Sequence, residues 1–303
     1  MKVVIAGGTG FLGQPLAEAL ASGGRDVVVL TRRLGAHAVD SRIRQVAWNP
    51  DEGKGPWTAE VEGAAVVNLA GEPIAAKRWS PSQKQRILDS RVRATRALAE
   101  AVRAAARPPL AFISGSAVGY YGPLGDEVVR EDHAAGSDFL AGVCRQWEAE
   151  ATQGAAGVTR VACVRTGLVL EKDGGALRQM LTPFKLGVGG PLGSGRQYWP
   201  WIHRDDWVSL VRWAIDTSSA SGAINATAPT PVTNAEFTRS LGRALHRPAF
   251  MPAPGFALRL ALGEMADALL LSGQRAIPAA AERLGFKFRY RDLDQALAAI
   301  FAA

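Results

Sequence analysis

The chain has 303 residues, of which 48% are hydrophobic and 21% are charged, a balance that excludes an intrinsically disordered protein. Its two cysteines and four histidines lie without metal-ligand spacing, and charges interrupt its apolar stretches, so we expect a cytoplasmic protein with no metal and no membrane partner. The formal net charge of +7 equals the excess of nine Lys or Arg over two acidic residues within 77–107, so the remainder of the chain is neutral in total.

The N-terminus is predicted to form a strand, a glycine-rich turn and a helix in direct succession. Residues 2–6 are a short run rich in residues that favour strands, the string GGTGFLG follows at once, and residues 14–21 are patterned as a helix. Three glycines at this spacing allow a sharp bend, a close approach to a pyrophosphate and tight packing of the helix on the strand, so the pattern predicts a Rossmann dinucleotide site. The residues expected to line it are Gly7, Gly10, Phe11, Leu12 and Gly13.

The end of the second predicted strand, residues 26–30, indicates which dinucleotide is bound. An NAD site carries an acidic residue here to bind the ribose 2′-hydroxyl, but this chain has Thr31, Arg32 and Arg33. Two guanidinium groups can bind a 2′-phosphate through charge-assisted hydrogen bonds. We therefore expect the cofactor NADP(H); the alternative interpretation is an exposed basic turn.

Apolar runs alternate with helical segments further along the chain. Strands are predicted at 43–48, 64–69, 110–114 and 159–165, and helices at 80–104 and 138–154. This alternation predicts an α/β fold with a doubly wound parallel sheet, in which ligands bind at the carboxyl ends of the strands. The strand-end residues expected to contact the cofactor are Asn68, Leu69, Ala70, Gly71 and Ser114.

The predicted helix 80–104 carries most of the basic residues. Its apolar residues recur at helical spacing, so one face is expected to pack while the charges are solvated. The alternative is a surface that binds phosphate or an acidic partner. A nucleic-acid partner is not expected.

Several strings in the chain resemble the motifs of one superfamily. GGTGFLG, NLAG, ISGSAVGYYG, RTGLVL and WIHRDDW are similar to those of extended short-chain dehydrogenases/reductases, the superfamily of the nucleotide-sugar epimerases. Longer strings, among them GSGRQYWPWIHRDDW and LGEMADALLLSGQR, resemble an atypical branch, the NAD(P)-dependent epimerase-like proteins of the SDR39U1 or YfcH-like family. The resemblance covers nearly the whole chain.

The resemblance implies a Rossmann domain of the extended type and a smaller C-terminal α+β domain that closes over a small-molecule substrate. Residues 1–169 and a return segment, 205–228, are expected in the first domain. Residues 170–204 and 229–303 are expected in the second. Relatives often pair through the two long helices, so either a monomer or a homodimer is expected.

The catalytic pair of the family is missing from this sequence. In the relatives that the chain resembles, a Tyr-x-x-x-Lys pair moves the proton while nicotinamide moves the hydride. None of the four tyrosines here is followed by a lysine four residues later. Alignment on Glu148 places Leu140 and Cys144 at the two positions, both on a predicted apolar helix face, so Cys144 is interpreted as a core residue.

Four residues remain as candidates for catalysis. Ser116 matches the serine that binds a substrate oxygen in relatives, or it caps its own turn. Tyr120 and Tyr121 can reach the same place, or they form an aromatic wall. His203 titrates in the range suited to a general acid, although we favour an orienting role through a hydrogen bond to one of the two aspartates that follow it closely.

Arg91 is a further departure from the family pattern, because related epimerases carry an asparagine at this position. It places a cation near the expected cofactor pocket, where it binds a phosphate or an acidic substrate. The alternative is a surface ion pair with a neighbouring acid.

Two classes of function follow from these residues. The first is an NADP(H)-dependent oxidoreductase or epimerase that acts on a small polar substrate, including a nucleotide-linked one, without the tyrosine and lysine pair. The second is a non-catalytic NADP(H)-binding sensor that docks a partner.

Overall fold

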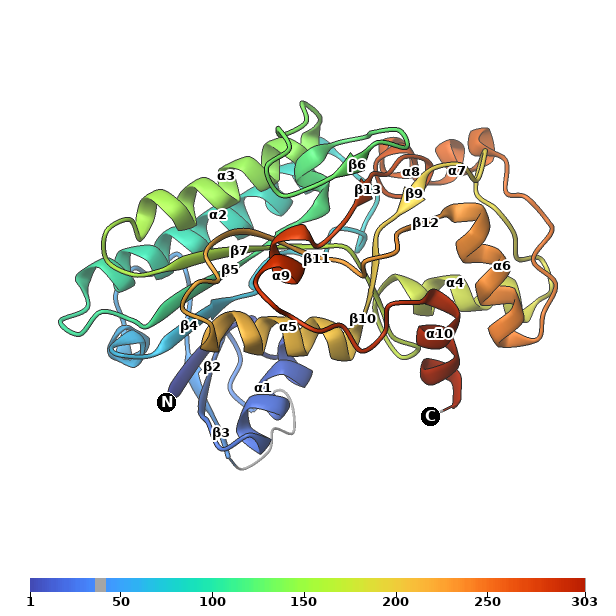
Figure 1. The fold of residues 1–303 in the computed structure, drawn as a ribbon. Helices are drawn as coiled ribbons and strands as arrows, with labels where there is room; N and C mark the ends of the chain where they lie inside the picture. Colours follow the sequence, from blue (N-terminus) through green and yellow to red (C-terminus); the bar gives the residue numbers. More distant parts are fainter. Residues whose placement is uncertain (36–41, 303) are drawn as a thin grey trace.

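The computed structural model describes residues 1–35 and 42–302, in which strands and helices alternate (Figure 1). In chain order, the elements of the first part are β1 (Lys2–Ala6), α1 (Gly13–Ser22), β2 (Asp26–Thr31), β3 (Ile43–Ala47), η1 (Pro56–Val61), β4 (Ala65–Asn68), α2 (Pro81–Ala104), β5 (Ala111–Ala117), η2 (Val118–Tyr121), β6 (Val128–Val129), α3 (Phe139–Gly154) and β7 (Val161–Thr166). They are followed by β8 (Leu168–Leu170), α4 (Gly175–Lys185), β9 (Tyr198–Trp199), β10 (Trp201–His203), α5 (Arg204–Asp216), β11 (Gly222–Ala226), β12 (Val232–Thr233), α6 (Asn234–Leu245), α7 (Gly255–Leu262), α8 (Glu264–Ala266), the π-helical turn η3 (Asp267–Leu271), β13 (Arg275–Ala276), α9 (Ala279–Arg283) and α10 (Leu293–Ala302).

A parallel seven-stranded sheet forms the centre of the larger part, with strand order β11-β7-β5-β4-β1-β2-β3. Strands β1 and β4 are apolar except for Lys2 at the start of β1 and Asn68 at the end of β4, because both of their faces are covered. The order reverses between β1 and β4, which is where doubly wound sheets bind their ligands. The predicted fold class is confirmed, and the predicted strands and helices lie within three residues of the observed ones.

Helices cover both faces of this sheet (Figure 1). Helices α1 and α5 pack on one face together with α9, and α2 and α3 pack on the other. Each helix turns one apolar stripe to the strands, as its spacing of buried residues requires. The two hydrophobic cores therefore hold the strand ends in fixed positions.

Three of the six cations of α2 form salt bridges with acidic residues of other segments, namely Lys84, Arg93 and Arg96. Lys84 lies 2.8 Å from Glu264, and Arg96 donates two hydrogen bonds to Glu150 on α3. These contacts reduce the positive charge that α2 offers to a phosphate or to a partner.

A second core lies at the other end of the molecule, around α4, α6 and α10 (Figure 1). Between α7 and α10 the tail returns to the larger part, where β13 pairs with β6 and Phe286 and Phe288 join the core below α5. The domain boundaries expected from the sequence stay a prediction, since the chain crosses between the two cores at several points.

Close contact between α2 and α3 depends on a small residue. A side chain carbon added at Gly154 would lie 2.6 Å from the Cβ of Ala99, whereas nothing lies within 4 Å of one added at Gly142, earlier in α3. The two glycines of this helix therefore stand in different environments.

We expect Gly154→Ala to lower the free energy of unfolding by about 1–3 kcal/mol, because overpacking forces the helices apart. Gly142→Ala is the matched control, and it should raise the same free energy by about 0.5–1 kcal/mol because alanine favours a helix. Urea unfolding of both variants measures the difference, and equal effects of the two substitutions would contradict this packing.

Candidate functional site

The glycine-rich loop lies between β1 and α1, at the carboxyl edge of the sheet. Gly7 has φ +78°, a conformation that favours glycine, and a Cβ there would lie 2.7 Å from the main chain of Leu69. A Cβ on Gly13 would lie 2.2 Å from the Gly7 carbonyl oxygen, so the helix approaches the strand as closely as the sequence predicts. Gly7 and Gly13 therefore allow the backbone conformation of the turn and the close approach of α1 to β1.

The same loop fits the pyrophosphate of a dinucleotide. A Cβ on Gly10 would meet only the Gly7 carbonyl oxygen, at 3.3 Å, so the outer side of Gly10 is open to a ligand. No side chain caps the N-terminus of α1, where Leu12 is the cap residue, so its N–H groups and positive dipole end are available to phosphate. Phe11 packs its ring against Gly174 and Gly175 at the start of α4, which joins the loop to the second core.

The two arginines after β2 are both exposed beside this loop. The buried hydroxyl of Thr31 accepts a hydrogen bond from the Arg33 N–H at 3.2 Å and so shapes the turn. Asp26 begins β2 and lies at the opposite end of the strand. The structure therefore leaves both guanidinium groups available to an anion and places no acid of β2 beside them.

The end of β4 completes the edge next to the glycine loop. The buried Asn68 accepts a hydrogen bond from the Ala70 N–H at 3.1 Å and donates one to Thr95 on α2 at 2.8 Å. Leu69 donates its N–H to the Ala6 carbonyl and packs against the core. These bonds hold the turn that precedes Gly71.

Arg91 lies against that turn, and the surface ion pair considered from the sequence is wrong. Its guanidinium donates to the carbonyl oxygens of Glu72 at 3.1 Å and Ile87 at 2.9 Å, and it lies 5.2 Å from the ring centroid of Trp147. A Cβ on Gly71 would lie 3.2 Å from the same group. Burial lowers the pKa of Arg91. Arg91 thus holds the β4 turn onto α2.

Ser114 and Ser116 lie on β5, one on each side of Gly115, and have different surroundings. Ser114 is fully buried, and its hydroxyl donates to the main chain of Gly115. The hydroxyl of Ser116 donates to Glu148 on α3 at 2.7 Å. In this structure, therefore, Ser116 is engaged with a carboxylate and does not cap its own turn.

Glu148 also forms a buried ion pair with Arg165 at the end of β7. Two guanidinium nitrogens donate to the two carboxylate oxygens at 2.8 and 2.9 Å, and both side chains are largely buried. Burial would lower the pKa of Arg165, but the hydrogen bonds and charge of Glu148 raise it overall. Arg165 therefore stays positively charged and remains bound to this carboxylate.

Tyr121 contacts the same ion pair through Arg165. Its hydroxyl accepts a hydrogen bond from Arg165 at 3.0 Å and donates to Asn225 on β11 at 2.6 Å. The ring is 1% exposed, and burial raises the pKa of Tyr121 to about 12. These contacts commit the phenol to the interior of the protein. We call Ser116, Glu148, Arg165, Tyr121 and Asn225 the buried network.

Tyr120 differs from its neighbour. Its ring stacks on the Arg165 guanidinium at 3.5 Å, and it is half-buried. Within residues 1–35 and 42–302 its hydroxyl makes no hydrogen bond, so it is free to contact a ligand. Of the three hydroxyl-bearing candidates, Tyr120 alone has a hydroxyl without a hydrogen bond among the described residues.

The two positions of the missing pair lie in the core, as the sequence indicates. Leu140 and Cys144 are buried on the inner face of α3. The Cys144 thiol lies 3.7 Å from the Ala117 carbonyl oxygen, and burial raises its pKa to about 11. Neither residue can move a proton at neutral pH.

His203 joins α5 to the tail. Its Nδ1 accepts a hydrogen bond from the Asp205 N–H at 3.0 Å, and its ring stacks on Tyr290 with centroids 4.0 Å apart. Burial lowers the pKa of His203, against the opposing effect of the Asp205 and Asp206 carboxylates. This is the contact of an orienting residue, except that the partner is the main chain of Asp205 and not the expected carboxylate.

Two residues of this region, Asn225 and Glu131, were not predicted as site residues from the sequence. Asn225 accepts from Tyr121, and its own N–H donates to Glu131 at 3.0 Å. Asn225 lies 104 residues from Tyr121, and the pairing of β11 with β7 brings it into the site, whereas Glu131 lies in the loop soon after Tyr121. A strand prediction over 222–226 would have been needed to find Asn225.

Comparison with known proteins identifies two matching family models. The NAD dependent epimerase/dehydratase family matches residues 3–226, and a domain of unknown function, DUF1731, matches residues 253–300. An epimerase family protein of Mycobacterium leprae is 44% identical over 97% of this chain and 94% of its own length.

Solved structures agree with this result. The human epimerase family protein SDR39U1, crystallised with NADPH, has a TM-score of 0.90 and 35% identity, over 100% of this chain and 99% of that one. A nucleoside-diphosphate sugar epimerase of Corynebacterium glutamicum has a TM-score of 0.79 and 35% identity, over 99% of this chain and 58% of that one.

The ion pair inside the buried network should be costly to break. We expect Glu148→Ala to lower the free energy of unfolding by about 3–5 kcal/mol, because it leaves a buried guanidinium without its acid. Glu150→Ala, two residues further on, removes a partly exposed pair with Arg96 and should cost less than about 1 kcal/mol. Similar shifts for both variants in urea unfolding would show that the network does not stabilise the fold.

Proposed function

Because the chain belongs to the NAD-dependent epimerase/dehydratase family, in its SDR39U1-like branch, we propose that it is an NADP(H)-dependent oxidoreductase or epimerase acting on a small polar substrate, including a nucleotide-linked one. Bound nicotinamide would supply or accept a hydride. The protein's own residues bind and orient the two ligands and move the proton.

The preference for NADP(H) rests on one observation, the two exposed arginines beyond β2. A 2′-phosphate needs cations at this position, whereas the 2′-hydroxyl of NAD needs a carboxylate. The NADPH in the human relative supports the same choice. The uncapped start of α1 and the open side of Gly10 would hold the pyrophosphate.

For the proton we propose Tyr120, with Ser116 as the group that orients a substrate oxygen. Tyr120 carries a hydroxyl with no partner among the described residues and is fixed by stacking on Arg165. Ser116 can contact a substrate without losing Glu148, because its oxygen keeps free acceptor capacity while its proton stays on the carboxylate.

A second function, a sensor that binds NADP(H) without turnover, is favoured by a specific observation. Leu140 and Cys144 fill the positions of the family pair with apolar or un-ionised groups, and the Tyr121 phenol is committed to Asn225. A protein with this arrangement still binds the cofactor, because the buried network and the glycine loop share no residue.

A cytoplasmic location is part of the proposal, although one relative from Arabidopsis thaliana is described as chloroplastic. A small molecule is the expected ligand, and no nucleic-acid partner is proposed. Either a monomer or a homodimer is compatible with the paired charges of α2.

The cofactor preference predicts a selective loss of affinity. In the double variant Arg32→Ala/Arg33→Ala we expect the NADPH dissociation constant to rise about 10–100-fold, which corresponds to the roughly 1.5–3 kcal/mol of a charge-assisted hydrogen bond. Affinity for NADH should not change. Arg107→Ala is the control, an exposed arginine in an ion pair with Glu62. Calorimetric titration measures all three, and an equal loss for NADPH and NADH would reject the 2′-phosphate assignment.

Turnover distinguishes the enzyme from the sensor. Protein loaded with NADPH is incubated with sugar nucleotides, ketones and quinones while the nicotinamide absorbance is followed. With an active substrate, Tyr120→Phe should lower kcat about 10²–10⁴-fold, the usual contribution of a general acid. Tyr290→Phe, which keeps the ring stacked on His203, is the control.

Full activity of Tyr120→Phe would remove Tyr120 from the mechanism. No turnover with any member of the panel, together with tight NADPH binding, would favour the sensor.

A further inference from the structure

Several large apolar side chains are exposed to solvent at the end of the molecule furthest from the seven-stranded sheet. Leu186 is 72% exposed, Phe250 74%, Phe256 73% and Leu260 78%. Helix α7 has no buried residue although six of its eight side chains are apolar. Exposed apolar groups of this size and number commonly mark an interaction surface.

These side chains come from two segments that run side by side. The Met251 N–H donates to the Gly189 carbonyl at 3.2 Å, and the Gly193 N–H donates to the Ala253 carbonyl at 2.9 Å. Helix α7 begins directly after the second of these segments, at the upper edge of the same end in Figure 1. The exposed groups therefore belong to one end of the protein.

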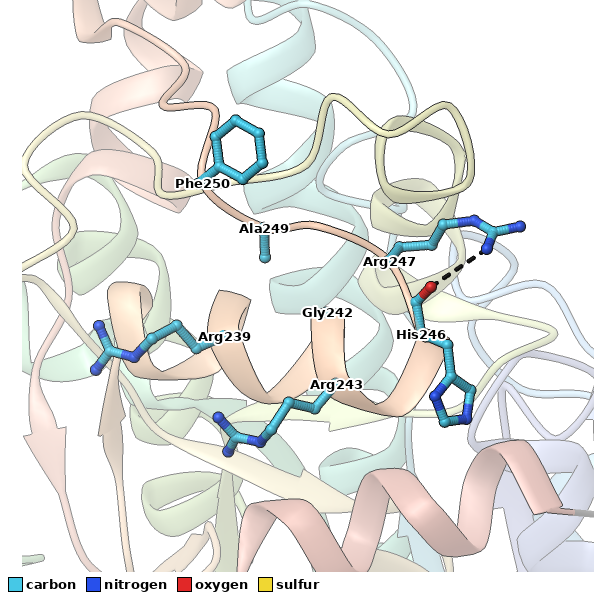
Figure 2. Close-up of a pocket in the computed structure, with 7 residues that line it drawn as sticks. All are labelled: Arg239, Gly242, Arg243, His246, Arg247, Ala249 and Phe250. Carbon is cyan, nitrogen blue, oxygen red and sulfur yellow. Dashed lines mark hydrogen bonds between the residues drawn. The ribbon is translucent and has the colours of Figure 1, made fainter.

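A hollow beside Phe250 adds positive charge to this end. Its volume is about 710 Å³, and α6 and the loop after it supply the lining (Figure 2). Arg239 and Arg243 project from the helix, while Arg247 and Phe250 come from the loop. Arg243 is paired with Asp294 at 2.7 Å, whereas Arg239 and Arg247 form no salt bridge with any described acid. The charge of Arg239 contributes to lowering the pKa of Glu236, at the start of the same helix.

The sequence of these segments is free of acidic residues. Neither 174–204 nor 237–263 contains an Asp or a Glu. Lys185, next to Leu186, is exposed and also has no salt bridge within the described chain. We name this surface, made of Lys185, Leu186, Arg239, Arg247, Phe250, Phe256 and Leu260, the distal face.

We propose that the distal face docks on the surface of a bilayer that contains anionic phospholipids. Leu186, Phe250, Phe256 and Leu260 enter the boundary between headgroups and acyl chains. Lys185, Arg239 and Arg247 contact lipid phosphates. Peripheral membrane attachment uses this combination of exposed apolar side chains and exposed cations that form no salt bridge.

A second copy of the chain fits the distal face less well. In a two-fold dimer the face would meet itself, so Lys185, Arg239 and Arg247 would lie near the same cations of the other copy. An acidic peptide fits this face less well too, because peptides bind in grooves whose apolar side chains are partly covered by their neighbours before the peptide arrives. Side chains more than 70% exposed project beyond their neighbours and suit a fluid layer.

The sequence led us to expect no membrane partner, because charges interrupt its apolar stretches. Within residues 1–35 and 42–302 no helix is both long and apolar enough to cross a bilayer. Attachment to one leaflet needs no such helix.

Sedimentation of the full-length protein with vesicles tests the proposal. Vesicles of phosphatidylcholine alone are compared with vesicles that also contain phosphatidylglycerol, at low and high salt. We expect binding to the anionic vesicles that falls at least tenfold in Phe256→Ser/Leu260→Ser and in Arg239→Glu/Arg247→Glu. Leu110→Ser and Arg107→Glu, exposed residues outside the distal face, are the matched controls and should bind as the parent does.

Failure to bind anionic vesicles, or equal binding by distal-face and control variants, overturns the proposal. Light scattering of the same proteins covers the second-copy alternative. A dimer that Phe256→Ser/Leu260→Ser converts to a monomer, without vesicle binding by the parent, assigns the face to self-association and also overturns the proposal. Circular dichroism checks that every variant is folded.

Discussion

The buried guanidinium of Arg165 is the constraint around which the candidate site is built. A cation removed from water must find a carboxylate and acceptors for its N–H groups. Glu148, the Tyr121 hydroxyl and the Glu131 carbonyl provide them, from three different segments of the chain. Once these contacts form, Ser116 donates to the same carboxylate and Tyr120 stacks on the cation. A single buried charge thus fixes the positions of three of the residues considered for catalysis.

This arrangement separates cofactor binding from chemistry. The glycine loop is held by main-chain packing, the β4 turn by Asn68 and Arg91, and the turn after β2 by Thr31. None of these residues belongs to the buried network. The family pair has been replaced by core residues, so cofactor affinity carries no information about turnover. The protein can keep its NAD(P) site under selection for either catalysis or sensing.

Local patterns in the sequence predicted most of the fold and the cofactor loop, because a strand, a glycine turn and a helix leave their marks over a few residues. The spacing of Gly7, Gly10 and Gly13 and the exposure of Arg32 and Arg33 are of this kind. Side-chain partners could not be predicted in the same way. Arg91 was expected either to bind a phosphate or an acidic substrate or to form a surface ion pair, yet it bonds to carbonyl groups of a turn 19 residues earlier and of its own helix. Tyr121 lies 104 residues from the asparagine that accepts its hydrogen bond. Such contacts depend on strand order, which periodicity does not specify.

A crystal structure of this protein with NADP⁺ bound would test the separation of cofactor binding from the buried network most directly. The expected result places the 2′-phosphate within hydrogen-bond distance of the Arg32 or Arg33 guanidinium while the Ser116 hydroxyl stays on Glu148. A 2′-phosphate that contacts neither arginine, or a Ser116 that has left Glu148 when the cofactor alone is bound, would contradict the account.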